Sequence, residues 1–309
     1  MLRAMSGSPK RRAALVSVGS NATLIVFKTG AGLLTGSVAI LSDAVQSTAD
    51  LIASVIAFVS VGKAEQPADD SHPYGHEKFE NASAAAEALL ILLGAAIIVY
   101  QAIGRLILPV GLNAAGIGIA VVAGAGLLNV IVSRYLDRIA KRTDSPALEG
   151  DAAHLRTDAI VSGGVLAGLV LTEVTGLRWI DPVVALIVAV AITHTGVRLL
   201  IVAFRVLVDE SVPPEDLAVI REAVMSFAPD GVMGYHNLRA RHAGGRHLVD
   251  LHVQFAAGSS LEAAHRTAHV LQDAIKGRLP NSEVLIHIEP EAAVRAGEEV
   301  VAQSVEPGV

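Results

Sequence analysis

The stretch ASAAAEALLILLGAAIIVYQAIGRLIL, which covers residues 82–108, decides the fold class because it is long and almost wholly apolar. A helix needs about 20 such residues to cross a hydrocarbon core of about 30 Å. Comparable stretches run over residues 13–34, 38–61, 114–134, 148–172 and 182–207. The sequence therefore predicts an all-α transmembrane domain of six helices within residues 1–208.

The composition of the 309 residues also favours a membrane protein, because 52% are hydrophobic and only 17% are charged. The chain contains no cysteine, which excludes disulfide scaffolds, thiolate zinc fingers, iron–sulfur sites and cysteine nucleophiles. Any metal must therefore be held by His, Asp, Glu or a neutral oxygen. A net charge of −6 and a low aromatic content argue against nucleic acid as a partner.

Lys and Arg in the short connections predict the orientation of the helices, since cytoplasmic loops carry an excess of them. They cluster before the first span, between the second and third spans, and between the fourth and fifth spans. These residues are Arg3, Lys10, Arg11, Arg12, Lys63, Lys78, Arg138, Lys141 and Arg142. We expect an integral, multi-pass protein of the plasma or inner membrane with both termini in the cytoplasm.

Beyond the last span the composition becomes that of a soluble domain, and residues 209–290 predict a small α+β fold of order αββαβ. Its first helix is expected from Pro214 to about Phe227, since proline and acids favour a helix start. Strands are expected over 232–241, 248–255 and 284–288, with a second helix over 260–279. This order suggests an antiparallel sheet backed by two helices. Residues 291–309 predict a disordered tail.

Polar residues inside two of the predicted spans form matching patterns, DxxQxxxD and DxxHxxxD. The first consists of Asp43, Gln46 and Asp50, and the second of Asp151, His154 and Asp158. Each set shares one stripe of its helix, because residues three, four and seven positions apart lie on the same face.

An ionised carboxylate in hydrocarbon costs roughly 2.5–3.5 kcal/mol, so these acids need a common cation or an aqueous cavity. A single Asp near a helix end is commonly interfacial or hydrogen-bonded to a neighbour, and this alternative applies to each residue taken alone. Two carboxylates, an imidazole and one further oxygen suit a tetrahedral divalent first-row metal. The two stripes together therefore predict a shared metal site, with Asp50, His154 and Asp158 at its centre.

The connection after the second span reads DDSHPYGHEKFE and gathers Asp69, His72 and His76. The spacing of the two histidines equals that of a protease zinc helix, but Pro73 and Gly75 break any helix there and no Glu lies between them. The segment predicts either a regulatory or structural metal site on a loop, or a polar turn with solvated histidines.

The soluble domain holds a third set of candidate ligands, which are His236, His252, His265, His287 and Glu289. His287 and Glu289 share one face of their strand because they are two residues apart. Convergence of the whole set depends on strand pairing, and single surface histidines are common. We interpret the remaining histidines of this domain, His242, His247 and His269, as surface residues.

Several short motifs, taken together, resemble those of one transporter family. They are SDAVQSTAD at 42–50, HPYGHEKFE at 72–80, DAAHLRTD at 151–158, GYHNLRAR at 234–241, DLHVQF at 250–255 and LIHIEP at 285–290. Over about residues 13–290 the chain is similar to the cation diffusion facilitators, which are six-span divalent-metal transporters with a metallochaperone-like cytoplasmic domain. The resemblance implies a homodimer in the lipid bilayer that exchanges metal for protons.

The family pattern carries over to this chain residue by residue. It implies transport ligands at Gln46, Asp50, His154 and Asp158, and a loop site at Asp69, His72 and His76. It also implies a paired metal site at the homodimer interface, made by His236, His252, His265, His287 and Glu289.

One position departs from the zinc-type pattern, which has His or Asp where this chain has Gln46. An amide oxygen is a weaker ligand, which shifts the site toward oxygen-preferring ions such as Fe²⁺ or Mn²⁺. The retained His154 argues against a purely manganese-type site, and Asp43 could supply the fourth ligand instead. We expect Zn²⁺ as substrate and regulatory ligand, with Fe²⁺, Mn²⁺, Co²⁺ and Cd²⁺ as further candidates.

Metal and protons would compete for the same atoms, because His154 ligates a metal only when it is neutral and Asp only when it is ionised. This competition predicts metal/proton antiport, and a soluble domain that faces the cytoplasm and senses metal there predicts efflux as its direction. Two other classes stay open, a membrane metal sensor or scaffold that binds without transporting, and an intramembrane metalloenzyme. The sequence contains no HExxH motif, so we expect no enzyme.

Overall fold

The computed structural model describes residues 8–35, 38–107, 116–177, 179–292 and 301–302. The chain divides into two compact units, Met1–Leu207 and Val208–Val309. Arg3, the predicted helix limits at residues 108 and 114, and most of the predicted tail lie outside the described residues.

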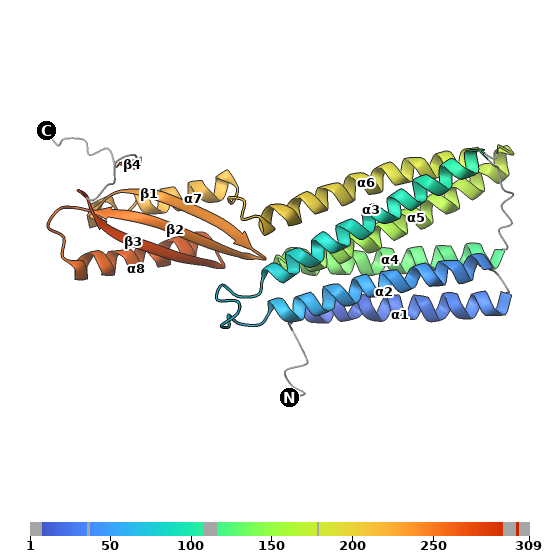
Figure 1. The fold of residues 1–309 in the computed structure, drawn as a ribbon, viewed down its shortest axis with the longest axis horizontal. Helices are drawn as coiled ribbons and strands as arrows, with labels where there is room; N and C mark the ends of the chain where they lie inside the picture. The colour runs from blue at the N-terminus through green and yellow to red at the C-terminus, as the bar shows by residue number, and fades with distance from the viewer. Residues whose placement is uncertain (1–7, 36–37, 108–115, 178, 293–300, 303–309) are drawn as a thin grey trace, which may run out of the picture. The chain divides into compact units, whose positions relative to one another are not determined.

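Six long helices make up the described part of the first unit (Figure 1). They are α1 Pro9–Thr35, α2 Val38–Ala64, α3 Lys78–Ile107, α4 Gly116–Thr143, α5 Pro146–Thr175 and α6 Ile180–Leu207. All six are long and apolar enough to cross a membrane. The predicted number and order of spans are therefore confirmed.

Some helices run beyond the predicted spans into charged sequence. α4 continues to Thr143, so Arg138, Lys141 and Arg142 lie in its last turns and not in the predicted loop. Basic residues suit this end of a helix because they complement its partial negative charge. Hydropathy marks the part of a helix that crosses hydrocarbon, whereas backbone hydrogen bonding continues past that part.

α5 packs between two apolar clusters of the six-helix unit. Its Leu148 and Leu155 belong to a cluster shared with α1, α2 and α4, and its Ala153 belongs to another shared with α3 and α6. The approach to α3 is close, because a Cβ on Gly150 would lie 3.2 Å from Cα of Ala84. α5 is therefore in contact with both halves of the bundle.

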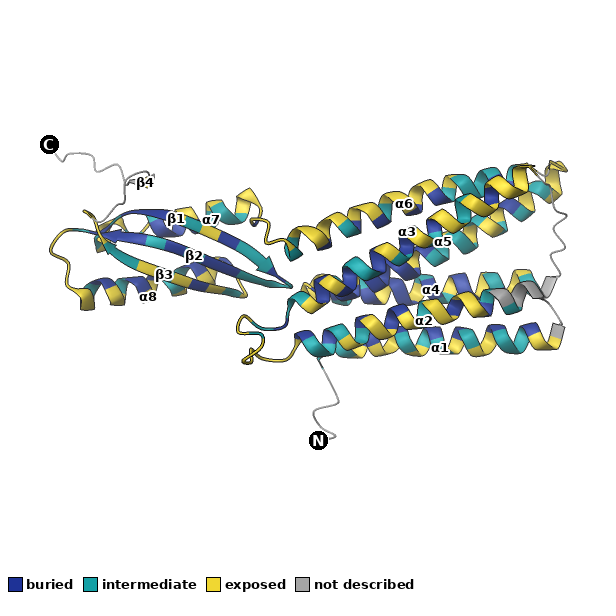
Figure 2. Ribbon diagram, viewed as in Figure 1, coloured by how far each residue is buried: buried dark blue, intermediate teal, exposed yellow. Residues whose placement is uncertain are grey.

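The six helices carry many large exposed apolar residues. Figure 2 colours exposed positions of every residue type yellow along the helix ribbons. Phe27 of α1, Leu93 of α3 and Val190 of α6 are examples. Extensive apolar exposure of this kind is unusual for a water-soluble surface and is expected where lipid surrounds the helices. The polar residues of the stripes are thus exceptions within an apolar unit.

The start of α5 is set by a helix cap. Ser145 is the N-cap residue, and its side chain accepts a hydrogen bond from the backbone N–H of Leu148. Ser145 also donates to the buried carboxylate of Glu80 in α3, whose Oε1 lies 2.9 Å from Nζ of Lys10 in α1. These contacts tie α1, α3 and α5 together one to two turns before the polar stripe of α5 begins.

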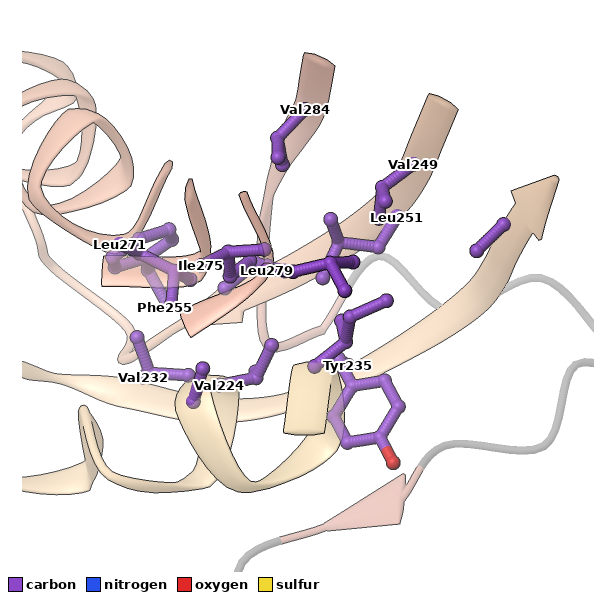
Figure 3. Packing of buried hydrophobic residues seen from close by; sticks show 14 of the residues in the cluster. Val224, Val232, Tyr235, Val249, Leu251, Phe255, Leu271, Ile275, Leu279 and Val284 are labelled. Carbon is purple, nitrogen blue, oxygen red and sulfur yellow. The ribbon is translucent and has the colours of Figure 1, made fainter. Parts of the chain in front are cut away.

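The second unit has the predicted order of helices and strands. Its elements are α7 Pro214–Met225, the 3-10 helix η1 Ala228–Asp230, β1 Val232–Ala243, β2 Arg246–Phe255, α8 Leu261–Arg278 and β3 Ser282–Pro290. Val224 of α7, Leu251 of β2 and Leu271 of α8 share one apolar core, so the two helices cover the same face of the sheet (Figure 3). The predicted αββαβ fold is confirmed.

The pairing of the strands differs from the antiparallel sheet that was predicted. The strand order is β3-β2-β1-β4, where β4 is Val301–Ala302. β1 and β2 pair antiparallel, but β2 and β3 pair in parallel. The prediction was wrong because α8 carries the chain back along the sheet, and a crossover of this kind joins parallel strands. β4 pairs with β1 inside the range predicted as a disordered tail.

Candidate metal centres

The polar stripes of α2 and α5 meet inside the six-helix unit. Nε2 of His154 lies 3.4 Å from Oδ1 of Asp50 and 3.9 Å from Oδ2 of Asp158. One ligand atom from each residue lies within 4.8 Å of the others. We call Asp50, His154 and Asp158 the membrane cluster. α5 supplies two of its members because they are one helical turn apart.

The membrane cluster is mostly buried, with side-chain exposures of 10% for His154, 17% for Asp50 and 23% for Asp158. In a tetrahedral zinc site, bonds of about 2.0–2.2 Å place ligand atoms about 3.3 Å apart. The separation between His154 and Asp50 is close to this value and no other exceeds 4.8 Å, so side-chain rotations would enclose a divalent ion. Two carboxylates and one imidazole leave one coordination position for a further oxygen.

The other two predicted residues of the α2 stripe have different surroundings. Oδ2 of Asp43 lies 2.9 Å from Nζ of Lys28 in α1, and Lys28 is buried. The side chain of Gln46 is exposed. Among the described residues, therefore, Asp43 is not part of the membrane cluster, and the role of Gln46, one turn before Asp50 on the same stripe, stays a prediction. Lys28 is not among the predicted residues, although a lysine inside an apolar span is itself a signal for a buried partner.

Two buried acids lie close to the membrane cluster. Glu87 of α3 is 1% exposed, and Asp151, which lies one turn before His154 in α5, is 0% exposed. Oε2 of Glu87 is 3.9 Å from Nδ1 of His154, the ring nitrogen that does not contact Asp50. A carboxylate at the second nitrogen of a metal-bound histidine orients the ring and fixes its tautomer. Glu87 is a functional candidate that was not predicted, and its signal is a lone carboxylate in the apolar stretch 82–108.

The connection between α2 and α3 brings Asp69, His72 and His76 together as the loop cluster. Oδ2 of Asp69 lies 3.3 Å from Nε2 of His76, and its Oδ1 lies 3.5 Å from Nδ1 of His72. Oδ1 also accepts hydrogen bonds of 2.7 Å from the Ser71 hydroxyl and from the His72 backbone N–H. The Ser71 hydroxyl and the His72 amide lower the pKa of Asp69 well below its usual range. Asp69 is therefore an ionised, exposed carboxylate beside two imidazoles.

Three neighbouring strands supply the tail cluster, which is His236 of β1, His252 of β2 and Glu289 of β3. Oε2 of Glu289 lies 2.8 Å from Nε2 of His236, and Oε1 lies 2.8 Å from Nδ1 of His252. His287 is also close, with Nε2 3.3 Å from Oε1 of Glu289. Partial burial acts to raise the pKa of Glu289, but the hydrogen bonds with His236 and His252 outweigh it, so the pKa is lowered.

His265 lies apart from the tail cluster in the part of the chain that the structure describes. It is exposed on α8, and its Nε2 lies 3.2 Å from Nε2 of His269. α8 covers the face of the sheet that holds Leu251, whereas His252 points to the opposite face. His269 is exposed as predicted, but His242 and His247 are half-buried, which corrects their interpretation as surface residues.

Residues 14–208 match the family profile of the cation efflux transmembrane domain, which is more than half of the chain. The chain belongs to the cation efflux family. Residues 212–291 match the profile of the cytoplasmic domain of cation efflux proteins. This is the family that the motifs predict, the cation diffusion facilitators, and the chain is an integral membrane transporter of cations.

Two relatives of this cation efflux protein align over almost their whole length. The uncharacterized transporter sll1263 of Synechocystis sp. is 36% identical over 286 residues, which are 93% of this chain and 92% of that protein. The cation-efflux pump FieF of Citrobacter koseri is 32% identical over 284 residues, which are 90% of this chain and 92% of that protein. Among solved structures, the metal-bound C-terminal domain of the CzcD transporter from Thermotoga maritima is 23% identical. It covers 27% of this chain and 100% of its own, with a TM-score of 0.25.

Proposed function

We propose that this cation efflux protein exports divalent transition-metal ions, with Zn²⁺ as the main substrate, in exchange for protons. The observation that supports the proposal is the membrane cluster, in which two carboxylates and an imidazole from two helices can reach one ion. The imidazole of His154 favours Zn²⁺ and its neighbours in the first transition row over Mg²⁺ and Ca²⁺, which prefer oxygen ligands. Fe²⁺, Mn²⁺, Co²⁺ and Cd²⁺ remain further candidate substrates because Gln46 stands where an imidazole or a carboxylate is expected.

Proton exchange follows from charge balance at the membrane cluster. Asp50 and Asp158 are mostly buried, so their two negative charges require a compensating cation inside the bundle. A divalent ion supplies two positive charges, and protons are the alternative when the ion leaves. Metal binding also requires neutral His154 and ionised carboxylates. Each ion that enters therefore displaces protons from the same atoms.

Alternating access is a natural consequence of a site that two helices share. Asp50 belongs to α2, whereas His154 and Asp158 belong to α5. A movement of α2 relative to α5 changes the separation of the ligands and therefore the affinity for the ion. We propose that both termini lie in the cytoplasm and that the chain works as a homodimer. In this arrangement the loop and tail clusters sense cytoplasmic metal and the direction of transport is efflux.

The decisive experiment compares Asp158→Asn with Glu173→Gln after reconstitution into vesicles. Both changes remove a carboxylate from α5 with little change in shape, but Glu173 is exposed and lies outside the membrane cluster. Asp158→Asn should abolish zinc flux driven by a proton gradient, and Glu173→Gln should leave it intact. Wild-type flux in Asp158→Asn would contradict the assignment. Zinc binding without flux in the wild type would instead indicate a sensor or scaffold.

A further inference from the structure

A fourth group of metal-ligating side chains lies in the unit of residues 208–309, at one end of its sheet. It consists of Asp216 in the first turn of α7, His242 near the end of β1 and His247 at the start of β2. One ligand atom from each lies within 4.8 Å of the others, and all three residues are half-buried. Neither the transport site nor the tail cluster uses any of them.

The β1–β2 hairpin holds the two histidines together through its backbone. The strands are joined at Gly244 and Gly245, and Gly244 has a φ of +58°, which favours glycine. His242 then pairs directly with His247 across the two strands. Side chains of directly paired residues emerge on the same face with Cβ atoms about 4.5–5.5 Å apart. The two imidazole centroids are accordingly 4.5 Å apart.

This pair lies on the opposite face of the sheet from the tail cluster. Along β2, His247 alternates in step with Val249 and Leu251, which belong to the apolar core under the two helices. His252 is five residues from His247, and an odd spacing places it on the other face. The group of Asp216, His242 and His247 is therefore separate from the tail cluster and lies at the margin of the helix-covered face.

Asp216 is brought to the hairpin by the segment that precedes α7. The backbone N–H of Val212 donates to the carbonyl of Ala240 at 3.1 Å, so this segment runs beside the end of β1. Oδ2 of Asp216 then lies 3.8 Å from Nε2 of His247, which is beyond hydrogen-bond distance. Nδ1 of His247 is buried and has no hydrogen-bond partner among the described residues. The carboxylate and the imidazole face each other without satisfying each other.

We propose that Asp216, His242 and His247 bind a divalent metal ion of the zinc type, which clamps the first turn of α7 to the β1–β2 hairpin. Two imidazoles and a carboxylate form a three-residue zinc ligand set, and water can take the fourth position. Tetrahedral coordination needs ligand atoms about 3.3 Å apart, so side-chain rotations must bring Asp216 and His247 closer by about 0.5 Å, and no pair of ligand atoms by more than about 1.5 Å. α7 is the first helix after α6, so the ion would restrain the start of the second unit.

Zinc counting tests the proposal on the full-length protein in detergent. The variants are His247→Gln and Asp216→Asn, and the control is His194→Gln, an exposed histidine of α6 outside every cluster described above. Competition with a zinc chelator gives the number of tightly bound Zn²⁺ ions per chain. We expect wild type and His194→Gln to bind the same number, and each of the two variants to bind one ion fewer.

Amide hydrogen exchange supplies an independent local measurement. Adding Zn²⁺ to the wild type should slow exchange in residues 214–219 and 242–247, and His247→Gln should abolish this effect. In β3, which carries Glu289, zinc should slow amide exchange in His247→Gln as much as in the wild type. This result would show that the variant is folded. Equal zinc counts in His247→Gln and His194→Gln would overturn the proposal. A loss of stability in Asp216→Asn without any change in zinc count would also overturn it, since an ion pair alone would then account for the group.

The inference is independent of the transport proposal. The ligand group lies wholly within the second unit, and its test measures binding and local exchange rather than flux. Failure of Asp158→Asn to lose flux would leave the zinc count at Asp216, His242 and His247 unaffected.

Discussion

Replacing Glu87 by Gln should weaken zinc binding at the membrane cluster without removing any of its ligands. Oε2 of Glu87 lies 3.9 Å from Nδ1 of His154, while Nε2 of His154 faces Asp50 and Asp158. The 3.9 Å separation is beyond hydrogen-bond distance, so Glu87 must move closer to accept from Nδ1 when a metal binds; it would then favour the tautomer that presents an unprotonated Nε2 to the metal and would orient the ring. The amide of Gln keeps the shape of the side chain but cannot supply a carboxylate to Nδ1. His154 should then ligate less well.

The size of the effect follows from the geometry of this contact. Two full unit charges 3.9 Å apart would interact by about 4 kcal/mol at an effective dielectric of about 20, which sets an upper limit for this pair. A ligating imidazole is neutral and carries only part of a charge, so the loss should be smaller than this limit. Removing such a carboxylate typically costs 10–100-fold in metal affinity, or about 1.4–2.7 kcal/mol. Solvent screening is weak here because Glu87 is 1% exposed.

The assay measures zinc affinity by equilibrium binding and zinc flux in vesicles for wild type, Glu87→Gln and Glu173→Gln. The last of these is the matched control, since Glu173 is an exposed carboxylate of α5. Glu87→Asp retains the carboxyl group and should recover part of the lost affinity. A zinc dissociation constant for Glu87→Gln within twofold of wild type would refute the role of Glu87 in positioning His154.

Three further predictions concern other parts of the molecule. Gln46→His should raise zinc flux relative to iron and manganese flux, and an unchanged ratio in a metal panel would mean that residue 46 does not ligate. The fold lowers the pKa of Glu289. The hydrogen bonds of its carboxylate therefore stabilise the metal-free protein fully at pH values above the ordinary Glu pKa of about 4.3. This stabilisation is lost as the pH falls through the lowered pKa. Glu289→Gln should therefore flatten the acid side of the stability profile, and an identical profile in thermal unfolding would contradict this. Leu271→Ala leaves a cavity at a fully buried position in the core of the second unit. The free energy of unfolding, measured with urea in detergent, should fall by about 2–5 kcal/mol. A fall of less than about 1 kcal/mol would contradict close packing around Leu271.

Much of the architecture could be predicted from local sequence. The six spans follow from the length of their apolar stretches. In hydrocarbon, only an α-helix satisfies all its backbone hydrogen bonds within a single segment. The elements of the second unit follow from alternation in β2 and from the Pro-rich start of α7. The parallel pairing of β3 was missed because it depends on the path of α8, and hydrophobic alternation is the same in parallel and antiparallel strands.

The membrane cluster was predicted for a related reason. His154 and Asp158 are one turn apart, so helical periodicity alone places them on one face, and the cost of burying Asp50 demands a nearby partner. Asp43 satisfied the same criteria, but the structure gives it Lys28 of α1 as a partner. Periodicity specifies the face of a helix and says nothing of which neighbour that face meets.

The amino-acid sequence therefore predicted the features that depend on positions within one helix or strand, namely the six spans and the two polar stripes. Its lack of cysteine also limited the possible metal ligands to His, Asp, Glu and neutral oxygens. Contacts between distant segments required the folded chain. Glu87 reaches His154 from another helix, and Asp216 reaches the pair His242 and His247 from a segment that runs beside β1. The physical reason is that local periodicity is set by backbone geometry, whereas the choice of partner is set by how whole elements pack, and many packings are compatible with the same periodicity.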